Sequence, residues 1–174
     1  MINIIENFVS DKECKELFDH YNLKIWDAED PFVKTGFGVG KEEALDLYNE
    51  DSLLSDIVKR IGAELSSHYG EEMELKSLFH SVMTPGAVNP LHWDNYIENG
   101  QDDISTLFYL NEDYTGGELH FPDQNKTIKP KVGTFIFFKG DESLMHEVKE
   151  VKSGNRNAFV GFFWPKRVRI SITN

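Results

Sequence analysis

The spacing of apolar side chains changes near residue 70 and divides the chain into two regions. Before that point, apolar residues recur every three or four positions in two segments, which is typical of helices with one buried face. After it, short apolar runs alternate with Gly, Pro, Asn and Asp, which is typical of strands separated by turns. We therefore expect a supporting region of about residues 1–70 and a β-rich core of about residues 72–174.

The supporting region is predicted to contain one strand and two helices. Residues 2–5 form the strand, and Ser10-Asp11-Lys12-Glu13 is a capping box that starts a helix running to about Tyr21. A second helix, about residues 51–69, carries an apolar stripe that should pack against a sheet. Residues 26–48 combine glycines with aromatic residues and predict a loop, either a lid over a substrate or an ordinary exposed connection.

The core region is predicted to be a series of short antiparallel strands. This rhythm is typical of two facing sheets in a jelly roll, so the expected fold class is mainly β with flanking helices. No internal repeat or linker divides the sequence, which favours one domain over residues 1–174. The expected strands cover about residues 72–83, 105–110, 118–121, 125–128, 134–138, 145–151, 158–164 and 168–172.

Charge and cysteine content limit the partners and the compartment. The net charge of −12 argues against a nucleic-acid partner, because affinity for phosphates rests largely on Lys and Arg. Cys14 is the only cysteine and permits no internal disulfide, and neither a signal peptide nor a long apolar run is present. We expect a cytoplasmic protein without a membrane partner. The sequence carries no signal for a particular oligomeric state.

Three residues of the core have the types and spacing of a metal site. His92 and Asp94 are two positions apart, so in a strand they would present an imidazole nitrogen and a carboxylate oxygen on the same face. His146 can supply a third ligand if its strand lies next to theirs. Two histidines and one carboxylate form the facial triad that binds ferrous iron and leaves positions open for other ligands.

A basic residue follows this candidate metal site in the sequence. Arg156 precedes the apolar run Ala158–Trp164, which predicts a buried strand with a cation at its start. A buried guanidinium needs an anionic partner, and its fork matches a carboxylate in a bidentate manner. Beside an iron site, Arg156 therefore indicates a dicarboxylate co-substrate whose far end it would hold.

Together, these segments resemble the core of the Fe(II)/2-oxoglutarate-dependent dioxygenases, in particular the prolyl 4-hydroxylase-like branch. The segment Ile5–Ser10 also resembles the opening strand and helix cap of that family, so the similarity covers most of the chain. The matching segments, in the order of the family, are His92-Trp93-Asp94, Thr106-Leu107-Phe108-Tyr109-Leu110-Asn111, Gly116-Gly117-Glu118-Leu119 with Phe121-Pro122, Gly133-Thr134-Phe135-Ile136-Phe137-Phe138, and His146-Glu147-Val148 followed by Arg156.

The resemblance implies a double-stranded β-helix, the cupin-like form of the jelly roll, with iron at its open end. It implies that His92, Asp94 and His146 are catalytic and bind Fe(II), and that 2-oxoglutarate and dioxygen are co-substrates, with ascorbate as a candidate reductant. The expected reaction hydroxylates an unactivated C–H bond and releases succinate and carbon dioxide. A prolyl residue in a peptide or protein is the first substrate to consider.

The resemblance also assigns the 2-oxoglutarate pocket. Arg156 matches the basic residue that binds the C5 carboxylate, and Tyr109 matches a tyrosine that helps to bind the same end. With a period of two, Leu107 shares a face with Tyr109, and Val160 shares one with Arg156, so these side chains can line one apolar pocket.

The sequence departs from the prolyl hydroxylase pattern at two positions. The tyrosine that the family carries before the His-x-Asp motif falls near Met83 or Thr84, and related enzymes often have a tryptophan near Phe162. Both positions belong to regions where co-substrate or substrate would bind. The substrate is therefore less defined than the iron chemistry.

Aromatic residues supply the candidate substrate contacts, because their rings would suit a pyrrolidine or another apolar group. An oxygenase acting on a free amino acid or small metabolite is an alternative, since no peptide-binding motif is present. A non-catalytic jelly-roll binding module is another. A nucleic-acid demethylase would ordinarily have a second arginine soon after the distal histidine, and here only Arg156 is present.

The aromatic residues that are candidate substrate contacts are Trp26, Phe32, Phe37, Tyr96 and Phe162.

Overall fold

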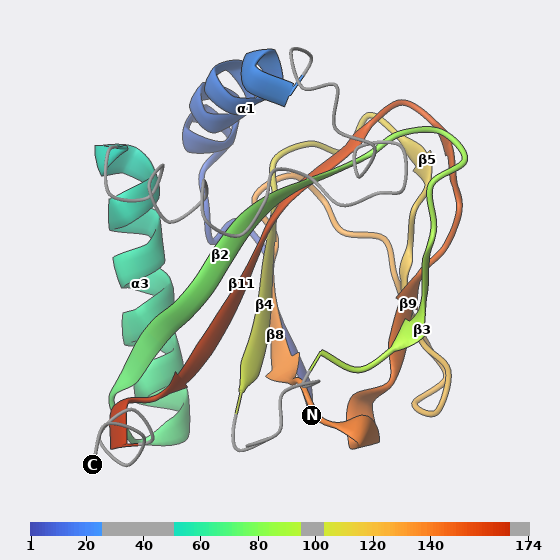
Figure 1. Ribbon diagram of the computed structural model, residues 1–174. Coiled ribbons are helices and arrows are strands. Elements are labelled where there is room, and N and C mark those ends of the chain that lie inside the picture. Colours follow the sequence, from blue (N-terminus) through green and yellow to red (C-terminus); the bar gives the residue numbers. More distant parts are fainter. Residues whose placement is uncertain (26–50, 95–102, 168–174) are drawn as a thin grey trace.

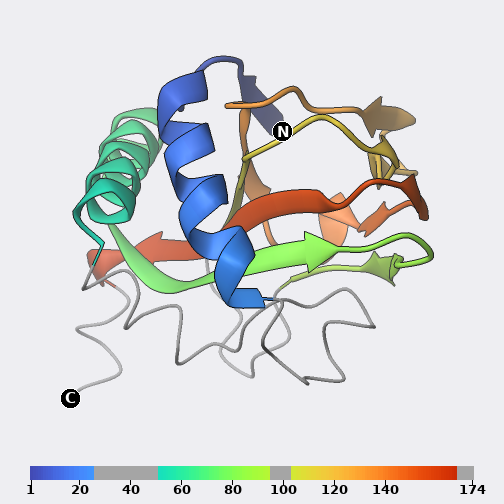
Figure 2. The same ribbon diagram turned by 90° about the horizontal axis from the view of Figure 1, so that it is seen from above.

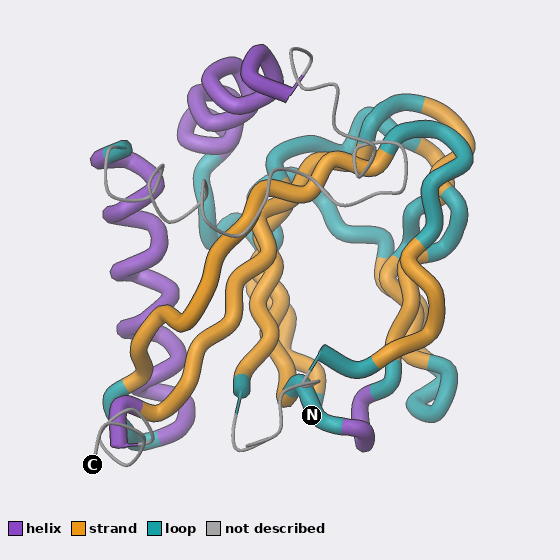
Figure 3. Tube along the Cα trace, in the orientation of Figure 1, coloured by secondary structure: helices purple, strands orange, loops and turns teal. Residues whose placement is uncertain are grey.

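Two facing β-sheets and two helices make up the part of the protein that the computed structural model describes, which is residues 1–25, 51–94 and 103–167 (Figure 1). The expected loop of residues 26–48 and the expected strand of residues 168–172 lie outside these residues. Strands and connecting turns alternate through the core region, which also contains a short 3₁₀ turn, while the two described α-helices belong to the supporting region (Figure 3).

The larger sheet has five antiparallel strands in the order β1-β8-β4-β11-β2. Its long central strand β11 pairs with β2 on one side and with β4 on the other, so Arg156 lies opposite Met83 and Ala158 lies opposite Tyr109. The strands are β1 (Ile2–Ile5), β2 (Met73–Met83), β4 (Ile104–Tyr109), β8 (Phe135–Lys139) and β11 (Arg156–Pro165).

The smaller sheet has four strands in the order β3-β9-β6-β7, and a two-stranded ribbon of β5 and β10 adjoins it. All their pairings are antiparallel, and this sheet faces the larger one (Figure 1). The expected jelly roll is thus confirmed. The strands are β3 (Asn89–His92), β5 (Thr115–Gly116), β6 (Leu119–Phe121), β7 (Lys126–Ile128), β9 (His146–Val148) and β10 (Val151–Ser153), and a 3₁₀ turn, η2 (Glu142–Leu144), precedes β9.

One predicted strand is wrong. Residues 145–151 were expected to form a single strand, but β9 ends at Val148 and β10 begins at Val151 in a different sheet. The chain leaves the smaller sheet where Lys149 N–H donates to the Glu118 carbonyl, and Val151 then pairs with Gly116. The local sequence does not reveal such a change of partner, because the change depends on which distant strands the two parts meet.

Both helices cover the face of the larger sheet that points away from the smaller one (Figure 2). The capping box is confirmed, because Ser10 N–H donates to Glu13 Oε2 at 2.8 Å and Glu13 N–H donates to Ser10 Oγ at 3.3 Å. Helix α1 (Asp11–Ile25) is four residues longer than predicted, and α3 (Ser52–Tyr69) begins at its N-cap Asp51. Among the described residues, neither helix is long and apolar enough to span a membrane.

Two hydrophobic clusters follow from this layering. The first lies between the helices and the larger sheet and includes Cys14, Leu17 and the apolar stripe of α3. The second lies between the two sheets and includes Met83, Leu107 and Tyr109. Residues of β4 and β11 alternate between the clusters because successive side chains of a strand point to opposite faces. The second cluster therefore forms the floor on which a site between the sheets can be built.

A buried histidine in the first cluster makes the stability of the fold depend on pH. His80 stacks on Phe159 with the ring centroids 4.9 Å apart, and neither of its ring nitrogens has a hydrogen-bond partner. Burial lowers the pKa of His80 to about 4, and the nearby Asn157 side chain opposes this effect only in part. The unfolded chain would take up a proton below about pH 6.5, whereas the folded protein would not until about pH 4.

We predict that the free energy of unfolding falls as the pH is lowered from 6.5 to 4, and that His80→Phe removes part of this fall. At pH 5 the contribution of His80 should be about 2 kcal/mol. Urea unfolding of both proteins at pH 7 and pH 5 measures it, with the difference expected to grow at pH 5 in favour of the variant. The same pH dependence in both proteins would contradict the prediction.

Candidate active site

His92 and His146 lie directly opposite each other on neighbouring strands. β3 pairs with β9, and the register places His92 against His146 with their ring centroids 4.4 Å apart. Asp94 does not continue β3 as the sequence analysis expected, because the strand ends at His92 and the chain bends. The bend still brings the Asp94 carboxylate between the two rings, 3.3 Å from His92 Nε2 and 3.4 Å from His146 Nε2.

Backbone carbonyls fix which imidazole nitrogen faces Asp94. His92 Nδ1 lies 2.6 Å from the Pro90 carbonyl, and His146 Nδ1 lies 3.0 Å from the Leu144 carbonyl. A carbonyl oxygen only accepts, so each Nδ1 carries a hydrogen and donates it. In the neutral form, each Nε2 then has a lone pair on the side that faces the carboxylate, and the Asn89 amide lies 3.4 Å from the Nε2 of His92. Hydrogen bonds of this kind commonly orient histidines that bind metals.

The pKa values of the three groups shift in different directions. Burial would lower the pKa of His92, but its contacts with Asp94 and with the Pro90 carbonyl raise it above the ordinary value. Burial would raise the pKa of Asp94, but His92, His146 and the nearby Ser105 hydroxyl lower it. Burial lowers the pKa of His146 and outweighs the attraction of Asp94. Asp94 is therefore held charged, and His146 is held neutral.

Aromatic residues from the core hold the His146 ring in place. Its centroid lies 4.8 Å from that of Phe138 in an edge-on arrangement and 5.5 Å from that of Phe121. His146 is 5% exposed, whereas His92 and Asp94 are partly accessible. One side of the cluster is thus fixed by the core while the other side can be approached.

The donor set fits a ferrous ion. One atom from each of His92, Asp94 and His146 lies within 4.8 Å of the others, so a single ion can contact all three after small adjustments. Two imidazole nitrogens and one carboxylate oxygen suit a divalent first-row metal and leave positions open for other ligands.

Arg156 is a fully buried cation between the two sheets. It is 1% exposed, and its Nη2 donates to the Tyr109 hydroxyl at 2.8 Å while Nη1 lies 3.6 Å from Met83 Sδ. Its Nε–H has no partner, and no described carboxylate forms an ion pair with it. Burial of an uncompensated charge is costly, so this environment fits an anionic ligand.

The residues predicted to line the pocket share this face. Leu107 lies opposite Val160 in the pairing of β4 with β11, and Tyr109 lies opposite Ala158, next to Arg156 along the strand. Phe162 is half-buried further along the same face of β11 and packs against Phe79. The second hydrophobic cluster connects this pocket with the metal site, because Phe121 and Phe138 belong to it and contact His146.

Two residues of this region, Ser105 and Tyr114, were not predicted from the sequence to belong to the site. Ser105 is fully buried beside Asp94, and its place on the same face of β4 as Leu107 and Tyr109 was a usable signal. Tyr114 lies in the connection between β4 and β5, where no periodicity predicts the direction of a side chain. Four predicted substrate contacts, Trp26, Phe32, Phe37 and Tyr96, lie outside the described residues.

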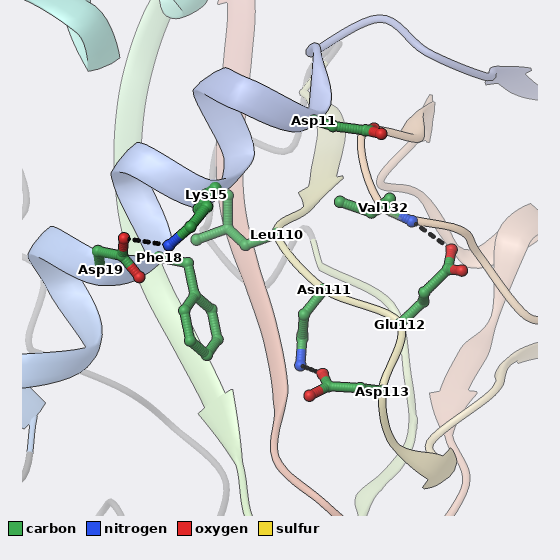
Figure 4. Close-up of a pocket in the computed structure, with 9 residues that line it drawn as sticks. All are labelled: Asp11, Lys15, Phe18, Asp19, Leu110, Asn111, Glu112, Asp113 and Val132. Carbon is green, nitrogen blue, oxygen red and sulfur yellow. Dashed lines mark hydrogen bonds and ion pairs between the residues drawn. The ribbon is translucent and has the colours of Figure 1, made fainter.

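A separate hollow lies between α1 and the segment that follows β4, and it contains none of the predicted site residues (Figure 4). It is an open depression of about 350 Å³. Three of its acidic groups already have partners, since Asp19 pairs with Lys15, the Val132 N–H donates to Glu112 and the Asn111 amide donates to Asp113. The residues that line it are Asp11, Lys15, Phe18, Asp19, Leu110, Asn111, Glu112, Asp113 and Val132.

Sequence comparison relates the chain to oxygenases. The 2OG-Fe(II) oxygenase superfamily matches residues 78–164, which is half of the chain. A PKHD-type hydroxylase of Prochlorococcus marinus (strain NATL1A) is 33% identical over 75% of this chain and 59% of its own length. The 2-oxoglutarate and iron-dependent oxygenase domain-containing protein 3 of Xenopus tropicalis is 29% identical over 69% of this chain and 41% of its own. The chain thus spans less than two thirds of the length of these relatives.

Solved structures of prolyl hydroxylases have the same fold. The viral collagen prolyl hydroxylase of Paramecium Bursaria Chlorella virus-1, solved with 2OG, has a TM-score of 0.71 at 21% identity, covering 94% of this chain and 95% of that one. A prolyl hydroxylase from Trichoplax adhaerens, solved with a hypoxia inducible factor peptide fragment, has a TM-score of 0.67 at 18% identity, covering 98% and 86%. At these identities the similarity concerns the fold alone.

We predict that divalent metal binding weakens as the pH falls, because the ion must displace the proton that Asp94 helps to retain on His92. Below the His92 pKa, the loss should approach about tenfold per pH unit. Asp94→Asn should lower affinity by more than about 100-fold and make the pH dependence shallower. Anaerobic calorimetry with Mn²⁺ at several pH values measures both effects.

His120→Ala is the matched control for this prediction. His120 binds Thr127 through Nδ1 and lies outside the metal cluster, so its removal should leave the affinity unchanged. Equal Mn²⁺ affinity in the wild type and in Asp94→Asn would contradict the assignment of Asp94.

Proposed function

The chain belongs to the 2OG-Fe(II) oxygenase superfamily, and from this premise we propose that it hydroxylates an unactivated C–H bond with Fe(II), 2-oxoglutarate and dioxygen. Succinate and carbon dioxide would be the other products. The observation that carries the proposal is the convergence of two Nε2 atoms and one carboxylate at a single point. This geometry favours an enzyme over a non-catalytic binding module, which has no need of three converging metal ligands.

His92, Asp94 and His146 would hold the iron in this proposal. The bound metal and 2-oxoglutarate would supply the oxidising chemistry. The protein would contribute orientation: the carbonyls of Pro90 and Leu144 keep both Nε2 atoms free for the metal, and the charged Asp94 balances the positive ion.

Arg156 and Tyr109 would bind the distal carboxylate of 2-oxoglutarate. Support comes from the Nε–H of Arg156, which has no partner, and from its bond with the Tyr109 hydroxyl, which positions the two groups together. Leu107 and Val160 lie opposite each other on β4 and β11 and would contact the carbon chain of the co-substrate. Such apolar walls exclude water and strengthen the charged contacts at the end of the pocket.

A prolyl residue in a peptide or protein is the proposed substrate. Prolyl hydroxylases recur among the proteins of similar fold, and one of them was solved with a peptide fragment bound. Phe162 is the proposed substrate contact among the described residues, and ascorbate is the proposed reductant. The buried free thiol of Cys14 fits a cytoplasmic location, which we retain as a prediction.

We predict that Ala at His92, Asp94 or His146 abolishes succinate production while the fold is kept. Iron-loaded protein would be incubated with 2-oxoglutarate, dioxygen and a panel of proline peptides and free amino acids, with succinate and oxygenated products followed by mass. The wild type should oxygenate a proline peptide. Unchanged succinate production in all three variants would overturn the proposed role of the triad, and oxygenation of a free amino acid alone would replace the proposed substrate.

We also predict that Arg156→Met raises the 2-oxoglutarate requirement by about 10- to 150-fold, the effect of losing a hydrogen-bonded charge pair of about 1.5–3 kcal/mol. The protein without co-substrate should be no less stable, because the variant removes a buried charge that has no anionic partner. Apparent KM values for 2-oxoglutarate and urea unfolding measure the two effects. An unchanged KM would exclude Arg156 from co-substrate binding.

A further inference from the structure

The Tyr114 side chain brings an unused hydroxyl next to Arg156. Tyr114 is 3% exposed, yet its hydroxyl has no hydrogen-bond partner. A buried hydroxyl without a partner is unfavourable and is therefore uncommon in folded proteins. The hydroxyl is close enough to the guanidinium for the two groups to interact, but a guanidinium only donates, so the hydrogen of the Tyr114 hydroxyl has no acceptor.

Gly117 allows these two side chains to approach each other. Its φ angle is +66°, and a Cβ at this position would lie 3.1 Å from Arg156 Cδ and 3.2 Å from Tyr114 Cε2. The Gly117 N–H donates to the Glu150 carbonyl at 3.1 Å, which ties this turn to the connection between β9 and β10. The backbone thus holds Tyr114 and Arg156 against the same glycine, so their closeness is built into the fold.

The chemical state of the Tyr114 hydroxyl fits a hydrogen-bond donor. Burial raises its pKa well above the ordinary value, and the charge of Arg156 reduces this effect only in part, while Tyr109 and Glu118 add to it. The hydroxyl therefore keeps its proton at neutral pH. Two donors without an acceptor are thus present at this place: the Nε–H of the buried Arg156 guanidinium and the O–H of Tyr114 beside it.

We propose that Tyr114 is a co-substrate-binding residue whose hydroxyl donates a hydrogen bond to the distal carboxylate that Arg156 and Tyr109 hold. The carboxylate would then meet a guanidinium between two phenols, and each donor would gain the acceptor that it lacks in the protein alone. This inference rests on the proposed function, because it needs a dicarboxylate co-substrate in this pocket.

The experiment compares wild type with Tyr114→Phe, which removes one oxygen atom and keeps the ring. Anaerobic calorimetry of Mn²⁺-loaded protein measures the affinity for 2-oxoglutarate and, separately, for oxalate, which presents two oxygens to a metal but carries no distal carboxylate. We expect roughly tenfold weaker 2-oxoglutarate binding in the variant and unchanged oxalate binding. Thermal unfolding of the metal-free protein should show equal or higher stability, because the variant removes a hydroxyl that has no partner.

Tyr69→Phe is the matched control, since Tyr69 packs near Phe137 on the opposite face of the larger sheet and its change should leave both affinities as they are. A 2-oxoglutarate affinity of Tyr114→Phe within twofold of wild type would overturn the role of Tyr114 alone. Equal losses for oxalate and 2-oxoglutarate, with lower stability, would also overturn it and identify a structural role. If the wild-type protein binds no 2-oxoglutarate, the inference and the proposed function fall together.

Discussion

The position of the Asp94 carboxylate between two imidazole rings is the constraint on which the rest of the site depends. Two backbone carbonyls hold the Nδ1 hydrogens, so both Nε2 atoms are turned to the same carboxylate. In the protein alone this arrangement raises the pKa of His92 and keeps Asp94 charged. In the proposed function, a divalent ion would displace the proton that Asp94 helps to retain on His92.

The pocket beside this cluster depends on the positive charge of Arg156, which has no anionic partner among the described residues. Arg156 is buried between the sheets, where its guanidinium contacts the Tyr109 phenol and the Met83 thioether, and neither of these groups neutralises its charge. The antiparallel pairing of β11 with β2 and β4 fixes the position of Arg156 through its opposite residue Met83. The surrounding apolar core would tolerate such a cation more easily with an anion beside it, and in the proposed function this would favour a negatively charged ligand. Fold stability and the proposed co-substrate binding would therefore be coupled at Arg156.

Much of this arrangement could be predicted because it follows from local signals. The capping box at Ser10 and the turn residues between short strands indicate the elements, and the face shared by Leu107 and Tyr109 follows from the period of a strand. The division of β9 from β10 could not be predicted, because it depends on which distant strand Val151 meets. Asp94 reaches His92 through a bend after the strand, and Tyr114 reaches Arg156 through the space left by Gly117. Both contacts arise from tertiary packing, which periodicity does not encode.

The proposed metal site would be tested by a crystal structure of the protein with Mn²⁺ and 2-oxoglutarate, grown without oxygen, in which anomalous scattering locates the metal. We expect one ion within roughly 2.0–2.3 Å of His92 Nε2, His146 Nε2 and an Asp94 carboxylate oxygen. A single ion bound elsewhere, with the two Nε2 atoms directed away from each other, would contradict this expectation.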